Sequence, residues 1–238
     1  METKIKRQVV LDTETTGMNK LGKPDEGHRI IEIGAVEIIN RRITGNYFHV
    51  YLNPERLIDK EAFAIHGISN IFLQDKPTFA EIADKFIKFI SGSELIIHNA
   101  KFDISFIDNE LIRLKSGMNN LNYYCKVTDS LLLARKIFPG KRNSLDALCD
   151  RYLINKSNRI KHGALLDAEI LAEIFLRMTG GQMSINFNFE QNNKKINIKN
   201  INDQLLLKII KANEQELIEH YSILKLIKKH SNKCLWII

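Results

Sequence analysis

The residues best suited to chemistry begin with a pair of acids near the N-terminus. Asp12 and Glu14 stand two positions apart in the segment Leu-Asp-Thr-Glu-Thr-Thr-Gly, which follows a short apolar run. Because side chains alternate along a β-strand, both carboxylates would project from the same face of a sheet. Two ionised carboxylates this close are costly unless a cation neutralises them, and a divalent metal ion is the simplest candidate. Such pairs also occur in solvated turns, so further acids are needed to favour a metal site.

Two aspartates later in the chain supply those acids. Asp103 follows an apolar run at the expected start of a helix, in the segment His-Asn-Ala-Lys-Phe-Asp. Asp167 lies in a helical pattern and falls on the same face as the apolar residues. A carboxylate that points into a core needs a compensating charge. Because carboxylates at the strand ends of a mixed sheet tend to share one crevice, we expect Asp103 to join the N-terminal pair.

Two histidines lie near these acids in the sequence. His162 comes five residues before Asp167, too far to share its face in one regular helix, so we expect it in the loop that enters that helix. His98 stands at the expected end of a strand. Imidazole ionises near neutral pH and therefore suits a general base, but a lone histidine is more often structural. The residues alone assign neither histidine to catalysis.

The elements that must position these residues follow from hydrophobic periodicity. The expected strands span residues 8–12, 30–39, 46–52 and 95–97. The expected helices span residues 79–90, 102–114, 128–137, 144–152 and 163–178. Three strands in succession, followed by helices alternating with strands, predict an α/β fold in which helices flank a mixed sheet.

The composition of the 238 residues is that of a soluble globular protein, with 44% hydrophobic and 26% charged residues. No apolar run reaches the roughly 18 residues needed to cross a bilayer, and the N-terminal run is too short for a signal peptide. We therefore expect a cytoplasmic protein with no membrane partner. Cys125, Cys149 and Cys234 are too few and too dispersed for a disulfide framework or a CxxC metal site, so we expect ordinary thiols.

Charge is distributed unevenly along the chain. From residue 186 onward nine lysines outnumber five acidic residues, so only +3 of the net charge of +7 belongs to the first 185 residues. Net charge is therefore weak evidence for nucleic-acid binding by the larger part.

The C-terminal part also differs in pattern. Gly180 and Gly181 end the last expected helix, and an asparagine-rich stretch follows. Beyond it, an apolar stripe at helical spacing between lysines needs a partner to be buried. The residues of this stripe and of the chain end are Leu217, Tyr221, Leu224, Ile227 and Trp236. We expect a catalytic domain at residues 1–181, a linker at 182–200 and a short helical tail at 201–238.

Three segments together resemble a known family. Asp-Thr-Glu-Thr-Thr-Gly at 12–17, His-Asn-Ala-Lys-Phe-Asp at 98–103 and His-Gly-Ala-Leu-Leu-Asp at 162–167 are similar, in this order, to the exonuclease motifs of the DnaQ-like DEDD superfamily. The histidine five residues before the last aspartate is typical of the DEDDh branch. With further similar segments, such as Arg29–Ala35 and the terminal Cys-Leu-Trp, nearly the whole chain resembles the epsilon proofreading subunits of bacterial DNA polymerase III.

This resemblance implies a ribonuclease-H-like fold and 3′ to 5′ hydrolysis of DNA with two Mg²⁺ or Mn²⁺ ions. Two cations can stabilise the attacking and the leaving oxygen of a phosphodiester together, and hard cations prefer oxygen ligands. His162 becomes the general base, whereas His98 is expected to be structural. The catalytic residues that bind the metal ions would be Asp12, Glu14, Asp103 and Asp167.

Contacts to the 3′-terminal nucleotide also follow from the resemblance. Asp129 and Asp146 also lie in segments similar to the family, but we assign them no chemical role and expect them only to stabilise helix starts. Phe102 has two readings, as a ring that stacks on the nucleotide or as part of the core. The expected substrate-binding residues are Asp12, Glu14, Thr15, Glu61, His66, Phe102 and Asp167.

The implied role is a subunit that removes mispaired deoxynucleotides while tethered to its polymerase. The tail would bind the polymerase alpha subunit, and Gln182, Ile185 and Phe187 resemble a peptide that docks on the sliding clamp. The sequence leaves open whether a small theta-like subunit binds the nuclease domain. Two alternatives are a DEDDh exoribonuclease, which the linker and apolar tail disfavour, and a nuclease-dead scaffold, which the intact motifs disfavour.

Overall fold

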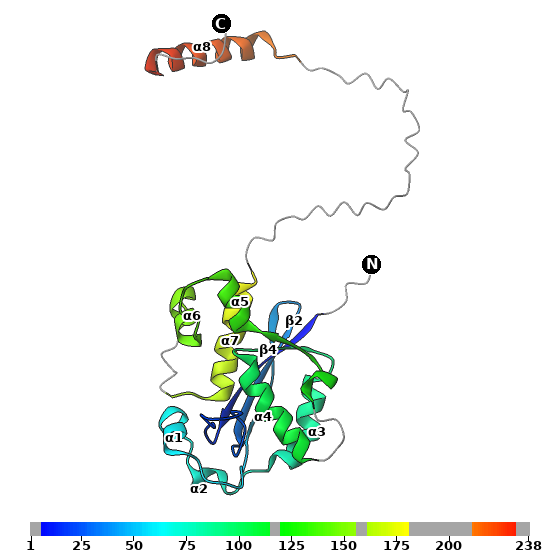
Figure 1. Ribbon diagram of the computed structural model, residues 1–238. Helices are drawn as coiled ribbons and strands as arrows, with labels where there is room; N and C mark the ends of the chain where they lie inside the picture. Colours follow the sequence, from blue (N-terminus) through cyan, green and yellow to red (C-terminus); the bar gives the residue numbers. More distant parts are fainter. Residues whose placement is uncertain (1–5, 115–119, 156–160, 181–210, 232–238) are drawn as a thin grey trace, which may run out of the picture. The chain divides into compact units, whose positions relative to one another are not determined.

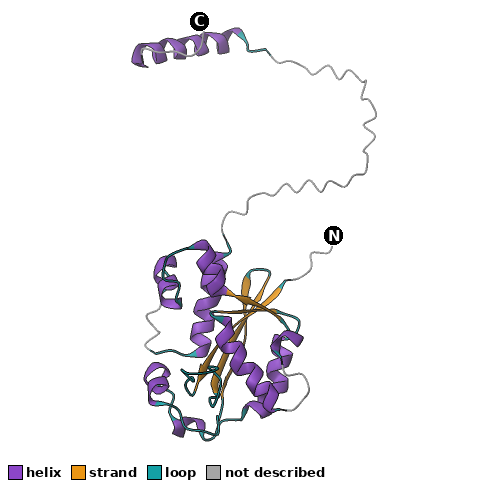
Figure 2. Cartoon of the chain, viewed as in Figure 1, coloured by secondary structure: helices purple, strands orange, loops and turns teal. Residues whose placement is uncertain are grey.

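A computed structural model describes residues 6–114, 120–155, 161–180 and 211–231. The chain divides into two compact units, residues 1–185 and 186–238. In the first unit, helices flank a mixed five-stranded sheet, which confirms the predicted α/β class (Figures 1 and 2). The strands are β1 (Arg7–Thr15), β2 (Ile30–Ile39), β3 (Arg42–Tyr51), β4 (Glu94–Ile97) and β5 (Lys126–Asp129). The helices are α1 (Lys60–His66), α2 (Asn70–Leu73), α3 (Phe79–Ile90), α4 (Ala100–Arg113), the 3-10 turn η1 (Leu121–Tyr123), α5 (Ser130–Ile137), α6 (Leu145–Tyr152) and α7 (Ala164–Met178).

The strand order is β3-β2-β1-β4-β5, so β1 lies at the centre of the sheet. β1 pairs antiparallel with β2 and parallel with β4, and β5 is parallel to β4. The carboxyl ends of β1, β4 and β5 therefore meet at one edge of the sheet. The acidic segment of β1 and the loop that begins α4 both lie at that edge.

Helices cover both faces of the sheet (Figure 1), and each face supports a separate core. Val9 and Leu11 of β1 pack in a cluster with α3 and α4. Val10 packs in another cluster with α6 and α7. The alternation of β1 thus assigns its even-numbered residues to the face that α7 covers.

Capping residues fix where several helices begin. Asp129 accepts hydrogen bonds from the N–H groups of Leu131 and Leu132 at the start of α5. The same carboxylate also accepts a bond from the Ala100 N–H at the start of α4 (3.1 Å). Asp146 lies in the first turn of α6, behind the N-cap Ser144. The predicted helix-stabilising positions of the two aspartates are therefore confirmed.

Two parts of the secondary-structure prediction are wrong. Residues 126–129 form β5, and the helix predicted from residue 128 begins only at Ser130. The strand is hard to recognise because its burial is only partial. The short helices α1 and α2 are also absent from the prediction, because they span only 7 and 4 residues and carry little periodicity.

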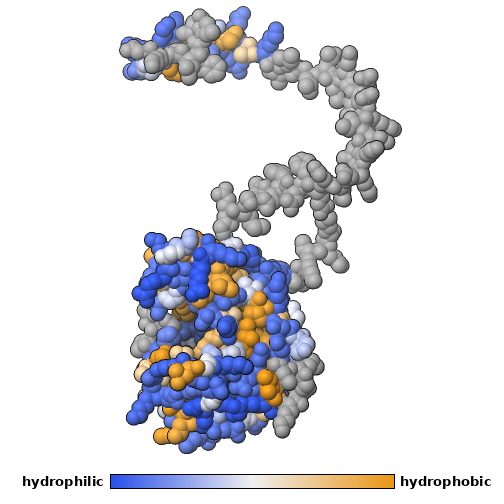
Figure 3. All heavy atoms as spheres, in the orientation of Figure 1, coloured by the Kyte–Doolittle hydropathy of each residue, from blue (hydrophilic) through white to orange (hydrophobic). Residues whose placement is uncertain are grey.

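The described part of the second unit is helix α8 (Glu214–Ser231). Several of its apolar side chains are exposed, including Leu217, Tyr221 and Ile227, whereas Leu224 is buried. Figure 3 shows hydrophobic residues beside hydrophilic ones on the visible face of this helix. The predicted clamp-binding residues Gln182, Ile185 and Phe187 lie outside the described residues, as do Cys234 and Trp236.

No helix in the described ranges is both long and apolar enough to span a membrane. The expected cytoplasmic location stays a prediction. Cys125 and Cys149 are both buried.

Candidate active site

β1 carries Asp12 and Glu14 on the sheet face covered by α7. Both are partly buried, and the intervening Thr13 is 7% exposed on the opposite face. In the pairing with β2, Asp12 is aligned with Gly34 and Glu14 with Glu32. The expectation that the two carboxylates share one face is therefore met by the strand geometry.

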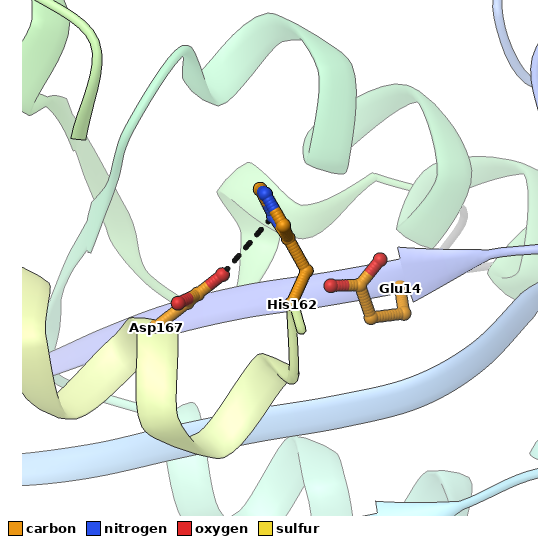
Figure 4. Close-up of side chains that lie close together, drawn as sticks. All are labelled: Glu14, His162 and Asp167. Atoms are coloured by element: carbon orange, nitrogen blue, oxygen red, sulfur yellow. Dashed lines mark ion pairs between the residues drawn. The ribbon is translucent and has the colours of Figure 1, made fainter. Parts of the chain in front are cut away.

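The start of α7 brings Asp167 and His162 to Glu14. Asp167 lies in the first turn of α7 and is 3% exposed, as its place in the apolar stripe predicts. His162 lies in the loop just before the N-cap Gly163, also as expected. Its Nδ1 atom is 3.4 Å from Oδ2 of Asp167, and potential ligand atoms of all three residues lie within 4.8 Å of one another (Figure 4).

Gly34 allows α7 to approach the sheet at this point. A Cβ atom on residue 34 would overlap the backbone of Ala164 and Leu165. The absence of a side chain at residue 34 of β2 therefore lets α7 lie this close to the sheet. Because Asp167 lies in the same helical turn, this contact also places its carboxylate beside β1.

Asp103 lies in the first turn of α4, which packs on the other face of the sheet. It is 4% exposed, and its Oδ1 atom accepts a hydrogen bond from Thr13 Oγ1 at 2.7 Å. Burial raises the pKa of Asp103 to about 7, although hydrogen bonds from Thr13 act in the opposite direction. Within the described ranges, the cluster of close ligand atoms comprises Glu14, His162 and Asp167, so Asp12 and Asp103 lie outside it.

This arrangement fits divalent cations. The carboxylates supply the oxygen ligands that hard cations prefer, and His162 offers a nitrogen. A buried carboxyl with a raised pKa lacks enough positive charge around it to keep its anion stable. A cation would supply that charge.

A pocket of about 650 Å³ opens beside Glu14. His66 is 6% exposed, and burial lowers its pKa, which favours the neutral form of the ring. The position of Phe102 is compatible with both of its predicted roles, nucleotide stacking and core packing. It lines the pocket and also packs against Phe106, with ring centroids 4.8 Å apart. The predicted substrate residues that line the pocket are Glu14, Thr15, Glu61, His66 and Phe102.

Sequence analysis does not single out Lys20 and Glu32, which also contact this region. Lys20 Nζ lies 2.6 Å from Glu61 Oε2 at the pocket, and this interaction lowers the pKa of Glu61. Glu32 is 2% exposed and accepts a hydrogen bond from the Ala164 N–H. Its position in a largely apolar strand was the available signal, although Glu37 in the same strand shares it. Lys20 has no comparable signal because it lies in a polar loop.

His98 lies apart from this group. Its Nδ1 atom is 3.0 Å from Ser130 Oγ, and burial lowers its pKa. These contacts connect β4 to the start of α5. They agree with the expected structural role.

Comparisons with known proteins agree with this geometry. The sequence model of the Exonuclease family (RNase_T) matches residues 9–175. DNA polymerase III subunit epsilon of Salmonella typhimurium is 58% identical over 99% of both chains, and that of Escherichia coli K12 is 57% identical over the same shares.

Solved structures share the fold. Exonuclease X in complex with 5′ overhanging duplex DNA is 27% identical, with a TM-score of 0.55 over 73% of this chain and 91% of the other. The nuclease domain of 3′hExo, described as a DEDDh family member bound to rAMP, is 18% identical, with a TM-score of 0.58 over 75% and 94%. The ribonuclease-H-like arrangement predicted for the sheet is thereby confirmed. The chain belongs to the exonuclease family and, within it, to the epsilon subunits of DNA polymerase III.

Proposed function

We propose that this proofreading 3′–5′ exonuclease hydrolyses the last phosphodiester of a DNA strand at the site around Glu14, His162 and Asp167. The convergence of these side chains within 4.8 Å carries the proposal. Glu14 also lines the adjacent pocket, which has room for a terminal nucleotide. A scissile phosphate bound between pocket and helix would meet both the carboxylates and the imidazole.

The carboxylates of Asp12, Glu14, Asp103 and Asp167 would hold two divalent cations, either Mg²⁺ or Mn²⁺. When bound, these ions supply Lewis-acid stabilisation of the negative charge that develops on the phosphate oxygens. The protein's own contribution is the rigid placement of the ligands, with Asp12 and Glu14 on β1, Asp103 on α4 and Asp167 on α7. Asp103 would be held in its ionised form once a cation offsets its burial.

His162 acts in this proposal as the general base that accepts a proton from the attacking water. Its side chain is 45% exposed and can therefore reach solvent and substrate. The Asp167 carboxylate faces Nδ1 and orients the ring. We assign Nε2 as the atom that receives the proton, because the orienting contact belongs to the other nitrogen.

The pocket would hold the terminal nucleotide. In this proposal the His66 ring and the exposed Glu61 carboxylate bond the sugar, and Phe102 offers a face for stacking. Both side chains of the Lys20–Glu61 pair are mostly exposed, so Glu61 can exchange this partner for a sugar hydroxyl. Stacking tolerates every base, so selectivity for a mispair would come from the lower cost of unpairing its end.

We further propose that α8 binds the polymerase alpha subunit. The helix has 18 residues and exposes apolar side chains along its length. An amphipathic helix of this kind buries its apolar face in a groove of another protein. The segment 182–187 remains a candidate for clamp binding, and a theta-like subunit remains an open prediction.

A degradation assay on labelled oligonucleotides tests the proposed function. The substrates are a primer with a mispaired 3′ end, the same primer fully paired, and RNA of equal sequence. We expect Mg²⁺ or Mn²⁺ to support stepwise 3′ degradation, fastest on the mispaired DNA, and excess chelator to abolish it. Preference for RNA would favour the exoribonuclease alternative, and full activity in chelator would contradict the metal site.

A further inference from the structure

Glu32 is a buried carboxylate outside the proposed ligand set. It lies in β2, whose neighbouring residues Ile31 and Ile33 are fully buried, and it is itself 2% exposed. A carboxylate in such surroundings is retained only where hydrogen bonds and a charge partner compensate its lost hydration. Its partners therefore indicate what it does.

One oxygen of Glu32 holds the start of α7. The Ala164 N–H donates to Glu32 Oε2 at 3.1 Å. Ala164 is the first residue of α7, and the N-cap Gly163 has no side chain that could accept this bond. The first N–H groups of a helix have no acceptor within the helix, and a negative charge near them is favourable. Glu32 supplies both the acceptor and the charge from a different strand.

The other oxygen contacts a histidine on the next strand. His49 Nε2 lies 2.8 Å from Glu32 Oε1, and the His49 side chain is 26% exposed. His49 on β3 is the cross-strand partner of Gly34 on β2, and therefore lies on the same sheet face as Gly34. The imidazole therefore contacts the Glu32 carboxylate on the sheet face that α7 covers.

The same strand thus connects both halves of the catalytic cluster. Glu32 is the cross-strand partner of Glu14, and it is also bonded to the helical turn that carries Asp167. Gly34, two residues further, sets the close contact of that turn with the sheet. A shift of Glu32 would change the distance between Glu14 and Asp167.

We propose that Glu32 is a positioning residue for the exonuclease reaction and that His49 orients its carboxylate. The inference rests on the proposed function, because it concerns the same metal-binding cluster. Glu32 acts through the backbone of α7 and not by contact with substrate. Groups that orient metal ligands typically change metal affinity or activity by about 10- to 100-fold when they are altered.

The test compares Glu32→Gln with Glu37→Gln. Glu37 is a matched control because it lies in the same strand, is 8% exposed and is paired with Arg7 Nε at 2.6 Å, but has no bond to α7. We expect Glu32→Gln to lower kcat by about 10-fold with KM for DNA within about twofold, and to raise the Mn²⁺ concentration for half-maximal activity by about 10-fold. The increase in Tm that Mn²⁺ produces should also shrink in this variant. Glu37→Gln should keep wild-type kinetics and Mn²⁺ response.

A second pair of variants does not depend on the folding of Glu32→Gln. His49→Gln retains an N–H donor for Glu32, whereas His49→Leu removes it. We expect His49→Gln to keep most of the activity and the Mn²⁺-dependent rise in Tm, and His49→Leu to lose both in part.

The outcomes separate this inference from the proposed function. A wild-type protein without Mn²⁺-dependent exonuclease activity would contradict the proposed function. An active wild type, with Glu32→Gln indistinguishable from Glu37→Gln in kcat and Mn²⁺ response, would overturn the positioning role alone. Equal activity of His49→Gln and His49→Leu would overturn the role of His49.

Discussion

Replacing Asp103 with Asn should stabilise the metal-free protein. Burial raises the pKa of Asp103 from 3.8 to about 7. Below pH 3.8 the carboxyl is protonated in both the folded and the unfolded chain, so it does not affect the free energy of unfolding. Between pH 3.8 and about 7 it ionises more readily in the unfolded chain, so stability falls as the pH rises. Above pH 7 the loss is complete.

The size of this loss follows from the pKa difference. At about 1.4 kcal/mol per pKa unit, the change from 3.8 to about 7 corresponds to about 4 kcal/mol at pH 8. Linkage gives about 2 kcal/mol at pH 5, where the folded protein still holds the proton. Asn is nearly isosteric, is always neutral and can still accept the Thr13 hydroxyl hydrogen bond through its amide oxygen.

Urea unfolding in excess chelator, followed by circular dichroism at pH 4, 5 and 8, measures the effect. The stability gained by Asp103→Asn over wild type should be near zero at pH 4 and increase toward pH 8. Its exonuclease activity should be lost, because a proposed metal ligand is replaced. A stability difference that stays constant with pH, or that has the opposite sign at pH 8, would refute the reasoning.

Three further predictions concern packing, thiols and domain organisation. Gly34→Ala should cost about 1–3 kcal/mol of stability and most of the activity because the added Cβ meets the backbone of α7, whereas Gly163→Ala, which has open space, should retain the wild-type Tm by calorimetry. Burial raises the pKa of Cys125 to about 11, so native protein at pH 8 should leave it unalkylated by iodoacetamide in mass spectra, and alkylation as fast as in denaturant would contradict its burial. A chain ended after Asn188 should degrade free oligonucleotides at the full-length rate but lose polymerase in pull-downs, and retained polymerase binding would place the contact outside the tail.

The sequence allows the parts of the site that rest on a single element to be predicted. Strand alternation places Asp12 and Glu14 on one face, and helical periodicity turns Asp167 inward, where it is 3% exposed. The loop position of His162 follows from its five-residue separation from Asp167. Each of these inferences needs only the local geometry of a strand or helix.

Features that depend on contacts between distant elements could not be predicted. The bond of Glu32 to Ala164 joins residues 132 positions apart, and no local pattern indicates it. Asp103 bonds Thr13, which lies 90 positions earlier in the chain, through the packing of α4 against the sheet. Strand β5 escapes recognition because its few half-buried residues carry little apolar alternation.

The single-turnover rate of His162→Ala on a mispaired primer tests the central claim most directly. The claim is that His162 accepts a proton while the carboxylates hold the cations. We predict a rate about 10²- to 10⁴-fold below wild type, with the Mn²⁺-dependent rise in Tm preserved. His98→Ala should reduce the same rate less, because its ring contacts Ser130 and not the cluster. An unchanged rate, or loss of the Mn²⁺ response in His162→Ala, would contradict the assignment and identify the histidine as a bystander or a metal ligand.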